Sequence, residues 1–238
     1  MKAMILAAGV GRRLRPLTDA IPKALIDVNG LPMIERVIRR LTAAGVTELV
    51  VNLFHLGDRI VEFLASKANF GLRIEFTREV ELLDTGGGLK NAAWFFDDGR
   101  PFFLHNVDVL SDIDLEGLLR FHRQVGALAT LAVQRRSGSR QLLFDRSGRW
   151  CGRESSEGVE WARVPVPDVE RLAFTGIHVI DPGIFSKMTE TGVFPITRTY
   201  LRLAGRGELI VAQRAEGRYW QDIGSPEKLE AARLRAAG

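Results

Sequence analysis

Short apolar runs alternate with amphipathic helical patterns over the first 135 residues, and this alternation restricts the fold more than any other feature of the chain. Strands this apolar are typical of a parallel sheet that helices cover on both faces. The predicted strands are 2–8, 48–53, 72–77, 101–109 and 127–135, and the predicted helices are 33–44, 57–67, 88–96 and 115–124. The order of these elements predicts a doubly wound, mostly parallel α/β fold.

Residues 136–238 show a less regular pattern. The segment "LLFDRSGRWCG" predicts a hairpin with its turn at 145–148, and the polar, proline-bearing segment 152–172 predicts a loop or lid. No linker separates the two halves, so we expect one domain in which 136–238 completes the sheet of 1–135. The remaining predicted elements are strands at 174–181, 208–213 and 218–224, short helices up to Ala204, and a helix at 225–235.

The composition excludes several classes of protein. No apolar run reaches the ~18 residues of a membrane span, and the start of the chain lacks the features of a signal peptide, so we expect a cytoplasmic protein. The net charge is +4, but the arginines are scattered rather than interleaved with aromatic residues, which argues against a nucleic-acid partner. Cys151 is the one cysteine, which excludes an internal disulfide and a cysteine-rich metal site.

A glycine-rich loop follows the first predicted strand, in the segment "LAAGVGRRLRPLT". Ligands of such sheets gather at the carboxyl ends of the strands, where this loop lies. Gly9 and Gly11 would let backbone N–H groups approach an anion, because no Cβ stands in the way. Arg12, Arg13 and Arg15 add guanidinium groups, which bind phosphate oxygens in pairs. The segment therefore predicts a loop that holds a polyphosphate.

Three other interpretations of this loop are weaker. A P-loop ends in Gly-Lys-Ser/Thr, whereas Gly11 is followed by Arg12. A dinucleotide-binding fingerprint, as in a dehydrogenase, has a third glycine where Leu14 stands and a helix that Pro16 argues against. A plain strand-to-loop turn accounts for the glycines but leaves the arginines unexplained. Lys23, a little further along, supplies one more cation.

The stretch "LAAGVGRRLRPLTDAIPKALIDVNGLPMI" resembles the signature of the sugar-1-phosphate nucleotidyltransferases, in which L-A-A-G-x-G-x-R-L-x-P-L-T is followed by P-K-x-L. Further matches reach residue 229, so the resemblance covers nearly the whole chain. It implies an enzyme that transfers a nucleotidyl group from an NTP to a sugar 1-phosphate and releases pyrophosphate. It also implies that Arg13 binds the triphosphate and that Lys23 stabilises charge at the reacting phosphates. The residues whose backbone would hold the nucleotide are Leu6, Ala7, Ala8, Gly9 and Gly11.

Two aspartates follow predicted strands and match landmarks of the same family. Asp108 stands in "FFLHNVDVL", which resembles the N-x-D segment of the family, and Asp222 stands in the closing "DIGSP" segment. The resemblance implies that the pair binds Mg²⁺, which prefers one or two carboxylates together with phosphate oxygens and water. A capping or turn role is the simpler interpretation of either aspartate alone. Val107 departs from the family, in which glycine often precedes the aspartate.

The resemblance also implies where the base and the sugar bind. The segment "LLDTGGGLKNA" predicts contacts to the base from Thr85, Gly86 and Gly87, although a flexible connection would also explain three glycines. The segment "FTGIHVID" resembles the strand on the sugar side. The halves 1–135 and 136–238 would then bind the nucleotide and the sugar respectively. The residues assigned to the sugar are Asn106, Glu154, Thr175 and Gly176.

One family feature is missing, namely the Glu-Lys-Pro run whose lysine binds the sugar phosphate. Glu154 lies in "GRESSEG" with no lysine near it, so Arg153 or Arg163 would substitute, or the acceptor is held differently. The implied chemistry needs no general base, because the attacking phosphate is already an anion. We therefore expect His105 to be a polar residue at a strand end rather than a catalytic base.

The nucleotide and the sugar are the least determined part of the prediction. Compact members of the family with L-x-T-G-G-G resemble N-acetylmuramate-1-phosphate uridylyltransferases of cell-wall recycling, which favours UTP. No hexapeptide-repeat domain follows the last predicted helix, so we expect a minimal catalytic unit. A guanylyltransferase for mannose or heptose 1-phosphate is the alternative, and a non-catalytic module that binds nucleotide sugars is a third. We expect a monomer or small homo-oligomer without nucleic-acid or membrane partners.

Overall fold

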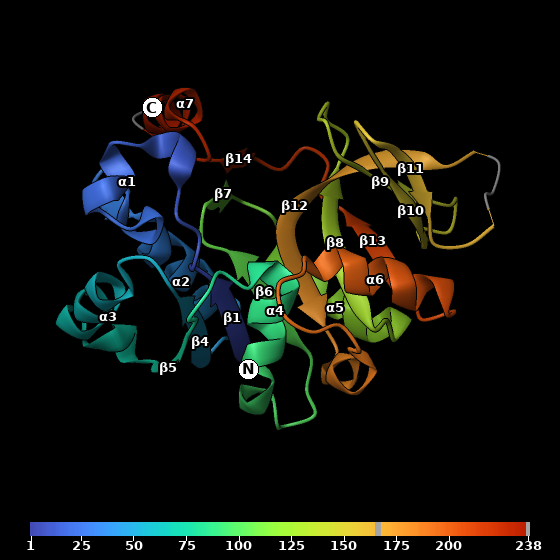
Figure 1. The fold of residues 1–238 in the computed structure, drawn as a ribbon, viewed down its shortest axis with the longest axis horizontal. Helices are drawn as coiled ribbons and strands as arrows, with labels where there is room; N and C mark the ends of the chain where they lie inside the picture. The colour runs from blue at the N-terminus through green and yellow to red at the C-terminus, as the bar shows by residue number, and fades with distance from the viewer. Residues whose placement is uncertain (165–167, 237–238) are drawn as a thin grey trace. The chain divides into compact units, whose positions relative to one another are not determined.

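The computed structural model describes residues 1–164 and 168–236, which form two compact units (Figure 1). The first unit comprises Met1–Leu82, His105–Ile113 and the chain from Tyr219 onward, and the second comprises Leu83–Leu104 and Asp114–Arg218. The two predicted halves are consecutive along the chain, whereas these units interleave. The expectation of a single domain stays a prediction.

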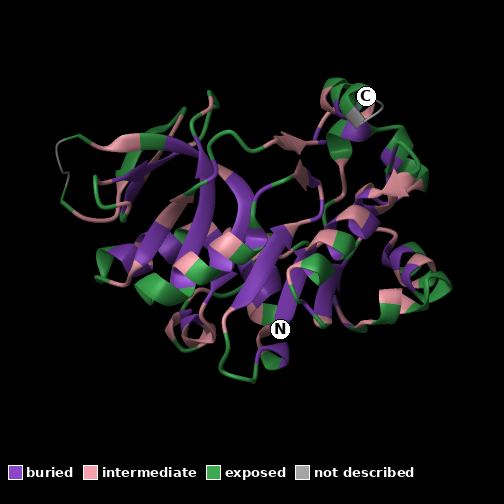
Figure 2. Ribbon diagram, turned by 180° about the vertical axis from the view of Figure 1, so that it is seen from behind, coloured by how far each residue is buried: buried purple, intermediate pink, exposed green. Residues whose placement is uncertain are grey.

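Three parallel strands form the sheet of the first unit, in the order β1-β4-β5. Lys2 pairs with Glu48, and Glu48 pairs with Arg73, so the three strands begin in register. Figure 2 shows strands of this sheet as buried, and β1 and β4 are buried almost throughout, as their apolar sequences require, whereas the edge strand β5 buries only Ile74 and Thr77. The strands are β1 (Lys2–Leu6), β4 (Glu48–Leu53) and β5 (Arg73–Arg78).

Helix α2 (Met33–Ala43) is amphipathic and buries Val37, Ile38 and Leu41 at helical spacing. The predicted stop at Gly45 is confirmed, because this residue has a φ of +83°, in the left-handed region that favours glycine. The other helical segments of the unit are η1 (Arg12–Leu14), α1 (Leu17–Ala20), η2 (Lys23–Leu25), α3 (Gly57–Ser66) and η3 (Ala68–Gly71).

A short antiparallel ribbon joins two segments that are distant in sequence. Strand β7 (Val109–Ser111) pairs with β14 (Trp220–Asp222), so that Val109 lies opposite Asp222. Helix α7 (Pro226–Ala236) follows the ribbon, and a small hairpin is formed by β2 (Asp27–Val28) and β3 (Leu31–Pro32). The start and the end of the chain share one apolar cluster, which contains Leu14, Ile26, Val28, Met33, Ile223, Leu229 and Ala232.

The sheet of the second unit is mixed, with the order β11-β10-β9-β12-β8-β13. Its pairs are antiparallel except for β8 and β13, which run parallel. Strand β6 (Phe102–Asn106) crosses the boundary between the two units. The strands of the mixed sheet are β8 (Ala129–Gln134), β9 (Gln141–Phe144), β10 (Trp150–Ser155), β11 (Gly158–Trp161), β12 (Glu170–Ile180) and β13 (Ile210–Arg214).

Helix α5 (Leu115–Val125) has clear signals at both ends. The Asp114 carboxylate accepts a hydrogen bond from the N–H of Gly117, and the helix stops at Gly126, which has a left-handed backbone. The other helical segments of the second unit are α4 (Asp84–Asn91), η4 (Ala93–Phe95), η5 (Pro182–Lys187) and α6 (Ile196–Gly205).

Three predicted segments differ from the structure. The predicted strand 101–109 is divided, because β6 ends at Asn106 and β7 begins at Val109. The predicted loop 152–172 instead contains the end of β10, all of β11 and the start of β12, with 165–167 outside the described residues. The strand β11 is exposed and carries charge, so its sequence lacks the apolar alternation that marks a buried strand. The predicted helix 88–96 begins earlier, at Asp84, and includes all three glycines.

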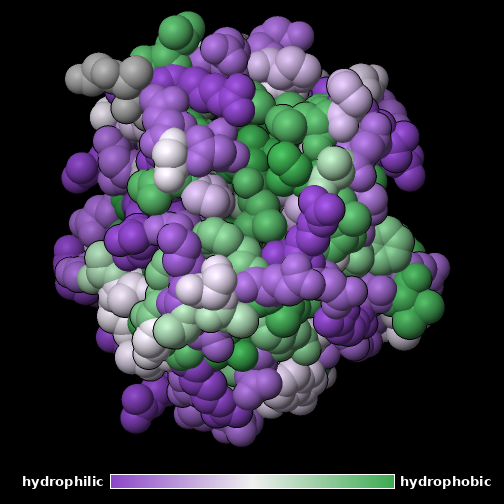
Figure 3. Space-filling view, turned by 90° about the vertical axis from the view of Figure 1, so that its left-hand side faces the viewer, coloured by the Kyte–Doolittle hydropathy of each residue, from purple (hydrophilic) through white to green (hydrophobic). Residues whose placement is uncertain are grey.

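The predicted α/β class with a mostly parallel central sheet is confirmed, and antiparallel strands are added in the second unit. No helix among the described residues is long and apolar enough to cross a membrane. Figure 3 shows one face of the molecule, on which hydrophobic side chains gather between hydrophilic ones. Apolar atoms contribute much of the surface of any folded protein, so this band does not by itself identify a binding surface.

Candidate functional site

The predicted phosphate loop follows β1 and is shaped by its two glycines. Gly9 is exposed, and a Cβ built on it would meet no atom within 4 Å. Gly11 has a φ of +69°, and a Cβ on it would lie 2.8 Å from Cγ2 of Thr18. The carbonyl of Gly11 accepts hydrogen bonds from the N–H of Leu14 (2.8 Å) and from the Thr18 hydroxyl (3.0 Å). Thr18, which the sequence analysis did not single out, therefore closes the turn.

Two of the predicted nucleotide-binding residues have backbone groups that are already paired. The carbonyl of Leu6 accepts from the N–H of Val107, at 3.1 Å. The N–H of Ala7 donates to Oδ1 of Asn52 at 2.7 Å, and the side-chain amide of Asn52 donates to Glu79 at 2.7 Å. Asn52 and Glu79 are buried polar residues at the ends of β4 and β5. Sequence reasoning missed this support, although a polar residue in the apolar run "LVVNL" was a signal for it.

The cations of the loop segment divide into two groups. Arg12 and Arg13 are exposed, whereas Lys23 is half-buried and its Nζ contacts Oδ2 of Asp108. A Cβ built on Gly224 would lie 2.6 Å from a guanidinium nitrogen of Arg13 and 2.7 Å from Oδ1 of Asp222. A glycine at 224 therefore lets the Arg13 side chain reach the segment that carries Asp222.

The predicted metal ligands Asp108 and Asp222 lie at the same end of the β7–β14 ribbon. Asp222 is the last residue of β14, and Asp108 immediately precedes β7. The N–H of Ile223 donates to the carbonyl of Asp108 at 3.0 Å, which brings the two residues together although they are far apart in sequence. Oδ2 of Asp222 accepts from Nζ of Lys228 at 2.5 Å, and Oδ1 accepts from the N–H of Gly224 at 3.0 Å.

The charges around Asp222 favour its ionised form. Burial would raise the pKa of this carboxyl group, but the hydrogen bonds from Lys228 and from the N–H of Gly224, with the charges of Lys228 and Lys23, lower it below its ordinary value. The influence of Lys23 on Asp222 shows that one ammonium group acts on both aspartates. Lys228 was not predicted, and its place in "SPEKL", one turn into α7, was the available signal.

The donor set fits a hard divalent cation. The side chains of Asp108 and Asp222 retain 23% and 18% of their exposure, so their oxygens can be reached. The described residues contain no group of three or more acidic, histidine or cysteine side chains that could hold a metal by themselves. Two carboxylates with phosphate oxygens and water are the ligands that Mg²⁺ prefers. A metal at this position would therefore need the phosphates of a ligand to complete its shell.

The predicted base-binding segment is packed inside the second unit. The N–H groups of Gly86 and Gly87 both donate to the carbonyl of Phe194, at 2.9 and 3.2 Å, and the hydroxyl of Thr85 accepts from the N–H of Ile196 at 2.9 Å. A Cβ on Gly86 would collide with the Phe194 ring, and one on Gly87 would lie 2.6 Å from the carbonyl oxygen of Gly192. The alternative of a flexible connection is wrong, because the three glycines lie in α4 and allow close packing, and the contacts of Thr85, Gly86 and Gly87 to a base stay a prediction.

The residues predicted to bind the sugar are engaged in different ways. Thr175 is fully buried and its hydroxyl donates to the carbonyl of Ala132 at 2.7 Å, so this group serves the sheet. Gly176 has a φ of +80° at a register shift between β12 and β8. Glu154 forms an ion pair with Arg171 at 2.7 Å. Asn106 is half-buried at the end of β6.

His105 is fully buried, with Nδ1 2.7 Å from the carbonyl oxygen of Asn106. Burial lowers the pKa of this histidine to about 4, partly offset by the hydrogen bond to Asn106. The ring is therefore neutral at physiological pH. This agrees with a polar residue at a strand end.

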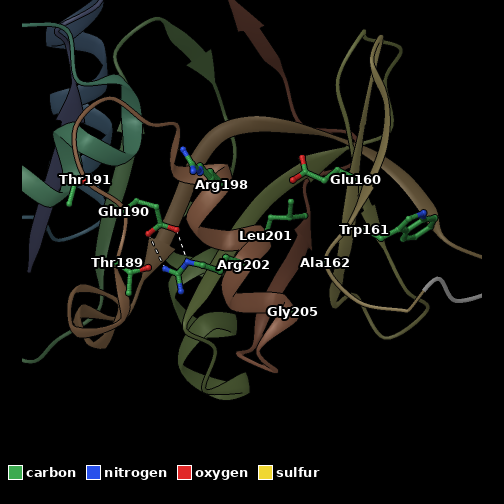
Figure 4. A pocket seen from close by; sticks show the side chains of 10 residues that line it. All are labelled: Glu160, Trp161, Ala162, Thr189, Glu190, Thr191, Arg198, Leu201, Arg202 and Gly205. Atoms are coloured by element: carbon green, nitrogen blue, oxygen red, sulfur yellow. Dashed lines mark hydrogen bonds and ion pairs between the residues drawn. The ribbon is translucent and has the colours of Figure 1, made fainter.

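A cavity of about 570 Å³ lies in the second unit, lined by α6, β11 and the segment before α6 (Figure 4). Glu190 and Arg202 form an ion pair at 2.7 Å across it, and Glu160 points into it from β11. Arg198 lies in the first turn of α6 and forms no ion pair with any described residue. The two arginines that were expected to replace the missing lysine are paired, Arg153 with Glu160 and Arg163 with Asp145.

The family model named nucleotidyl transferase matches residues 2–141, and the chain belongs to this family. The resemblance to sugar-1-phosphate nucleotidyltransferases is thereby confirmed. A mannose-1-phosphate guanyltransferase of Gibberella zeae is 43% identical over 241 residues, which cover 95% of this chain and 62% of that protein. A second, from Yarrowia lipolytica, is 31% identical with 95% and 61% coverage. The chain thus spans about three fifths of the length of the curated relatives that it matches.

Solved structures share the fold at lower identity. The structure of HddC from Yersinia pseudotuberculosis complexed with GMP-PN superposes with a TM-score of 0.77 at 20% identity, covering 99% of both chains. A UDP-glucose pyrophosphorylase complexed with UDP-glucose gives the same TM-score at 18% identity, covering 99% of this chain and 98% of that one. These likenesses support the fold.

Proposed function

We propose that the protein transfers a guanylyl group from GTP to mannose 1-phosphate, giving GDP-mannose and pyrophosphate. The observation that carries this proposal is the assembly of Lys23, Asp108 and Asp222 beside the Arg13 loop within a member of the nucleotidyl transferase family. The names of the most similar relatives favour GTP and mannose 1-phosphate over the UTP and N-acetylmuramate 1-phosphate that the sequence analysis preferred. The guanylyltransferase, which was the alternative in the sequence analysis, is therefore better supported than the uridylyltransferase.

The reaction joins two anions, and the proposed site is built to reduce their repulsion. An oxygen of the sugar phosphate attacks the α-phosphorus of GTP, a new P–O bond forms, and the bond to the β-phosphate oxygen breaks to release pyrophosphate. The attacking oxygen carries no proton, so the reaction does not require the neutral His105 as a general base. Positive charge that is fixed in place before the reaction is commonly a large contribution to catalysis. We assign this role to Lys23 and Arg13.

Asp108 and Asp222 would hold Mg²⁺, which fits their chemistry and exposure as described above. When bound, the metal supplies positive charge to the phosphate oxygens. The two lysines contact the two carboxylates, Lys23 at Asp108 and Lys228 at Asp222, and the hydrogen bond and charge of Lys228 favour the ionised form of Asp222. Ionised carboxylates are the form that binds a hard cation.

For the acceptor, we propose that Arg198 takes the place of the missing lysine. The N–H of Ile196, two residues before Arg198, donates a hydrogen bond to the hydroxyl of Thr85. Nη1 of Arg153 lies 3.5 Å from the hydroxyl of Thr197. The first turn of α6 therefore contacts the predicted base segment at Thr85 and strand β10 at Arg153, within the second unit. Arg153 itself is paired with Glu160, which leaves Arg198 as the guanidinium without an ion pair in this part of the described chain.

The test is a pyrophosphate-release assay with each pairing of GTP or UTP with mannose 1-phosphate or N-acetylmuramate 1-phosphate, with Mg²⁺. GTP with mannose 1-phosphate should give the highest kcat/KM. A preference for UTP with N-acetylmuramate 1-phosphate would return the assignment to the uridylyltransferase. Nucleotide-sugar binding without turnover for any pair would favour the non-catalytic module. The cytoplasmic location and the oligomeric state stay predictions of the sequence.

A further inference from the structure

A second cavity lies in the first unit, between α2, the β7–β14 ribbon and α7. Its volume is about 380 Å³, within the range of small-molecule sites. None of the residues predicted to bind the nucleotide, the sugar or the metal lines it. Its apolar lining consists of Leu31, Val37, Val109, Leu110 and Ala232.

The polar lining of this cavity is strongly cationic. Four arginines face it and Asp112 is the one carboxylate among its lining residues. Arg39 is paired with Glu35 at 2.6 Å. Arg36, Arg40 and Arg235 form no ion pair within the described chain, so three guanidinium charges meet one carboxylate. Such an excess of uncompensated positive charge favours an anion.

The guanidinium groups on α2 are held in place by neutral acceptors. Arg36 donates through Nη2 to the carbonyl of Val28, and its Nε is buried without a hydrogen-bond partner. Arg40 donates to the Ser111 hydroxyl and to the carbonyl of Ile113. Burial lowers the pKa of Arg40, and the nearby charge of Asp112 opposes that change. Preoriented, partly desolvated cations bind an anion at a smaller entropic cost.

An aromatic ring completes the lining. The guanidinium carbon of Arg235 lies 4.1 Å from the centroid of the Tyr219 ring. The backbone of Tyr219 is fixed to Asp112 by two hydrogen bonds, from its N–H to Oδ1 at 2.7 Å and from the N–H of Asp112 to its carbonyl at 3.2 Å. The cavity thus combines cations, a fixed ring and apolar side chains.

We propose that this cavity binds a phosphate monoester with an aromatic or apolar body. The phosphate lies on the guanidinium groups of Arg36, Arg40 and Arg235, whose planar donors suit phosphate oxygens. The body packs against Tyr219 and the apolar lining. Nucleoside phosphates and sugar phosphates both carry the phosphate group. They differ in the body attached to it, which is an aromatic base with ribose in one case and a sugar in the other.

The position of the cavity connects it to the predicted metal ligands. Asp112 and Tyr219 stand at one end of the ribbon, while Asp108 and Asp222 stand at the other. A ligand that binds at the first end stabilises the paired ribbon, because it binds the native arrangement in preference to the open one. We infer that occupancy of the cavity reduces local opening at the hydrogen bond from Ile223 to Asp108.

Isothermal titration calorimetry with phenyl phosphate tests the proposal, since this compound cannot donate a nucleotidyl group. We expect saturable binding at one site per chain, weakened about tenfold by Arg235→Ala and by Arg36→Gln, which corresponds to about 1.4 kcal/mol for each lost charged contact. Arg123→Ala is the matched control, because this exposed arginine on α5 lies outside the cavity. Arg235 lies near the end of α7, so its variant keeps the test valid if Arg36→Gln does not fold.

Two further measurements separate this cavity from the predicted catalytic site. Lys23→Ala and Arg13→Ala should leave phenyl phosphate binding unchanged, and deuterium uptake by the peptide that contains Ile223 should slow when the ligand is bound. Loss of binding in Lys23→Ala but not in Arg235→Ala would assign the ligand to the catalytic site and overturn the proposal. Absence of saturable binding to the wild-type protein would also overturn it.

The body of the ligand is tested with inorganic phosphate, GMP and glucose 6-phosphate, measured in the Lys23→Ala variant. Inorganic phosphate should bind more weakly than phenyl phosphate, and equal affinities would overturn the contact with Tyr219. Tighter binding of GMP would identify a nucleoside phosphate as the ligand, and tighter binding of glucose 6-phosphate would identify a sugar phosphate. Either result must be sensitive to Arg235→Ala to support the proposal.

Discussion

Lys23 and Asp108, which are 85 residues apart in the sequence, are in direct contact through Nζ and Oδ2. The same ammonium group lowers the pKa of Asp222. The lysine of the loop segment and the two aspartates of the ribbon are thereby one electrostatic unit. Changes to any member should affect activity more than stability.

Replacing Asp108 or Asp222 with asparagine should lower kcat by roughly 100-fold or more, because each change removes one of the two carboxylates proposed to hold the metal. Pyrophosphate release at saturating Mg²⁺ gives the measurement. Asp58→Asn is a suitable control, since Asp58 forms an exposed ion pair with Arg78. Wild-type turnover in either variant would remove that residue from the metal site.

Lys23→Ala should reduce kcat roughly 100-fold, with a smaller effect on the KM for GTP, if its charge acts on the transition state more than on bound nucleotide. Lys228→Ala supplies the comparison, because Lys228 contacts Asp222 alone in the described site. Its loss should shift the Mg²⁺ dependence of the reaction more than the limiting rate. A rise in the KM for GTP with unchanged kcat in Lys23→Ala would contradict the assigned role.

Arg198→Ala should raise the KM for mannose 1-phosphate about tenfold while leaving the KM for GTP near its original value, because one charged contact to phosphate is lost. Initial rates at varied acceptor concentration provide the test. Arg123→Ala removes the same charge elsewhere on the surface of the unit. An acceptor KM that is unchanged in Arg198→Ala would leave the acceptor phosphate without this partner.

Gly86→Ala should destabilise the protein by about 1–3 kcal/mol, because the added methyl group overpacks the contact with Phe194. The higher helix propensity of alanine opposes this loss by only about 1 kcal/mol. Denaturant unfolding measures the difference. Gly138→Ala is the control, since its Cβ would come no closer than 3.6 Å to the nearest atom. Unchanged stability in Gly86→Ala would show that α4 and the segment at Phe194 are not packed as described.

The ion pair between Glu190 and Arg202 should make stability depend on pH. Burial would raise the pKa of Glu190, but the hydrogen bond and charge of Arg202 prevail and lower it from its ordinary 4.5 to about 2. The stabilisation is therefore complete above the ordinary pKa and is lost as the pH falls through about 2. Glu190→Gln should be less stable than wild type at neutral pH, with the gap narrowing towards about pH 3.

Unfolding by urea at several pH values measures that gap. Glu62→Gln is the matched control, because Glu62 is exposed on α3 and forms no ion pair among the described residues. A gap that is equally large at neutral and acidic pH would mean that the two charges do not interact.

The parts of the fold that sequence predicted best carry their own local signals. The predicted strand 48–53 has the bounds of β4, and the predicted helix 115–124 differs from α5 by one residue at its end. An apolar run and a pair of capping residues are enough in these cases. The strand β11 is held by cross-strand ion pairs such as Arg153 with Glu160, and no pattern along the sequence reveals such a pair in advance.

The candidate site shows the same division. Lys23, Asp108 and Asp222 were identified from a motif, and the structure brings them together. Asn52, Glu79 and Lys228 were missed, because their roles depend on partners distant in sequence. The packing of the α4 glycines was missed for a related reason. Three glycines in a row indicate a space that is free of side chains. Either a nearby ring such as Phe194 or a ligand can fill that space, and the sequence does not distinguish between them.

The shared cluster of Leu14 with Leu229 and Ala232 has a consequence for the order in which the molecule matures. The ribosome makes the glycine turn long before the helix α7 that supports it. Until α7 leaves the ribosome, Leu14 lacks part of its apolar surroundings, and the backbone that carries the neighbouring arginines is not held in place. The nascent chain therefore acquires the shape of the proposed phosphate loop only after α7 has been made.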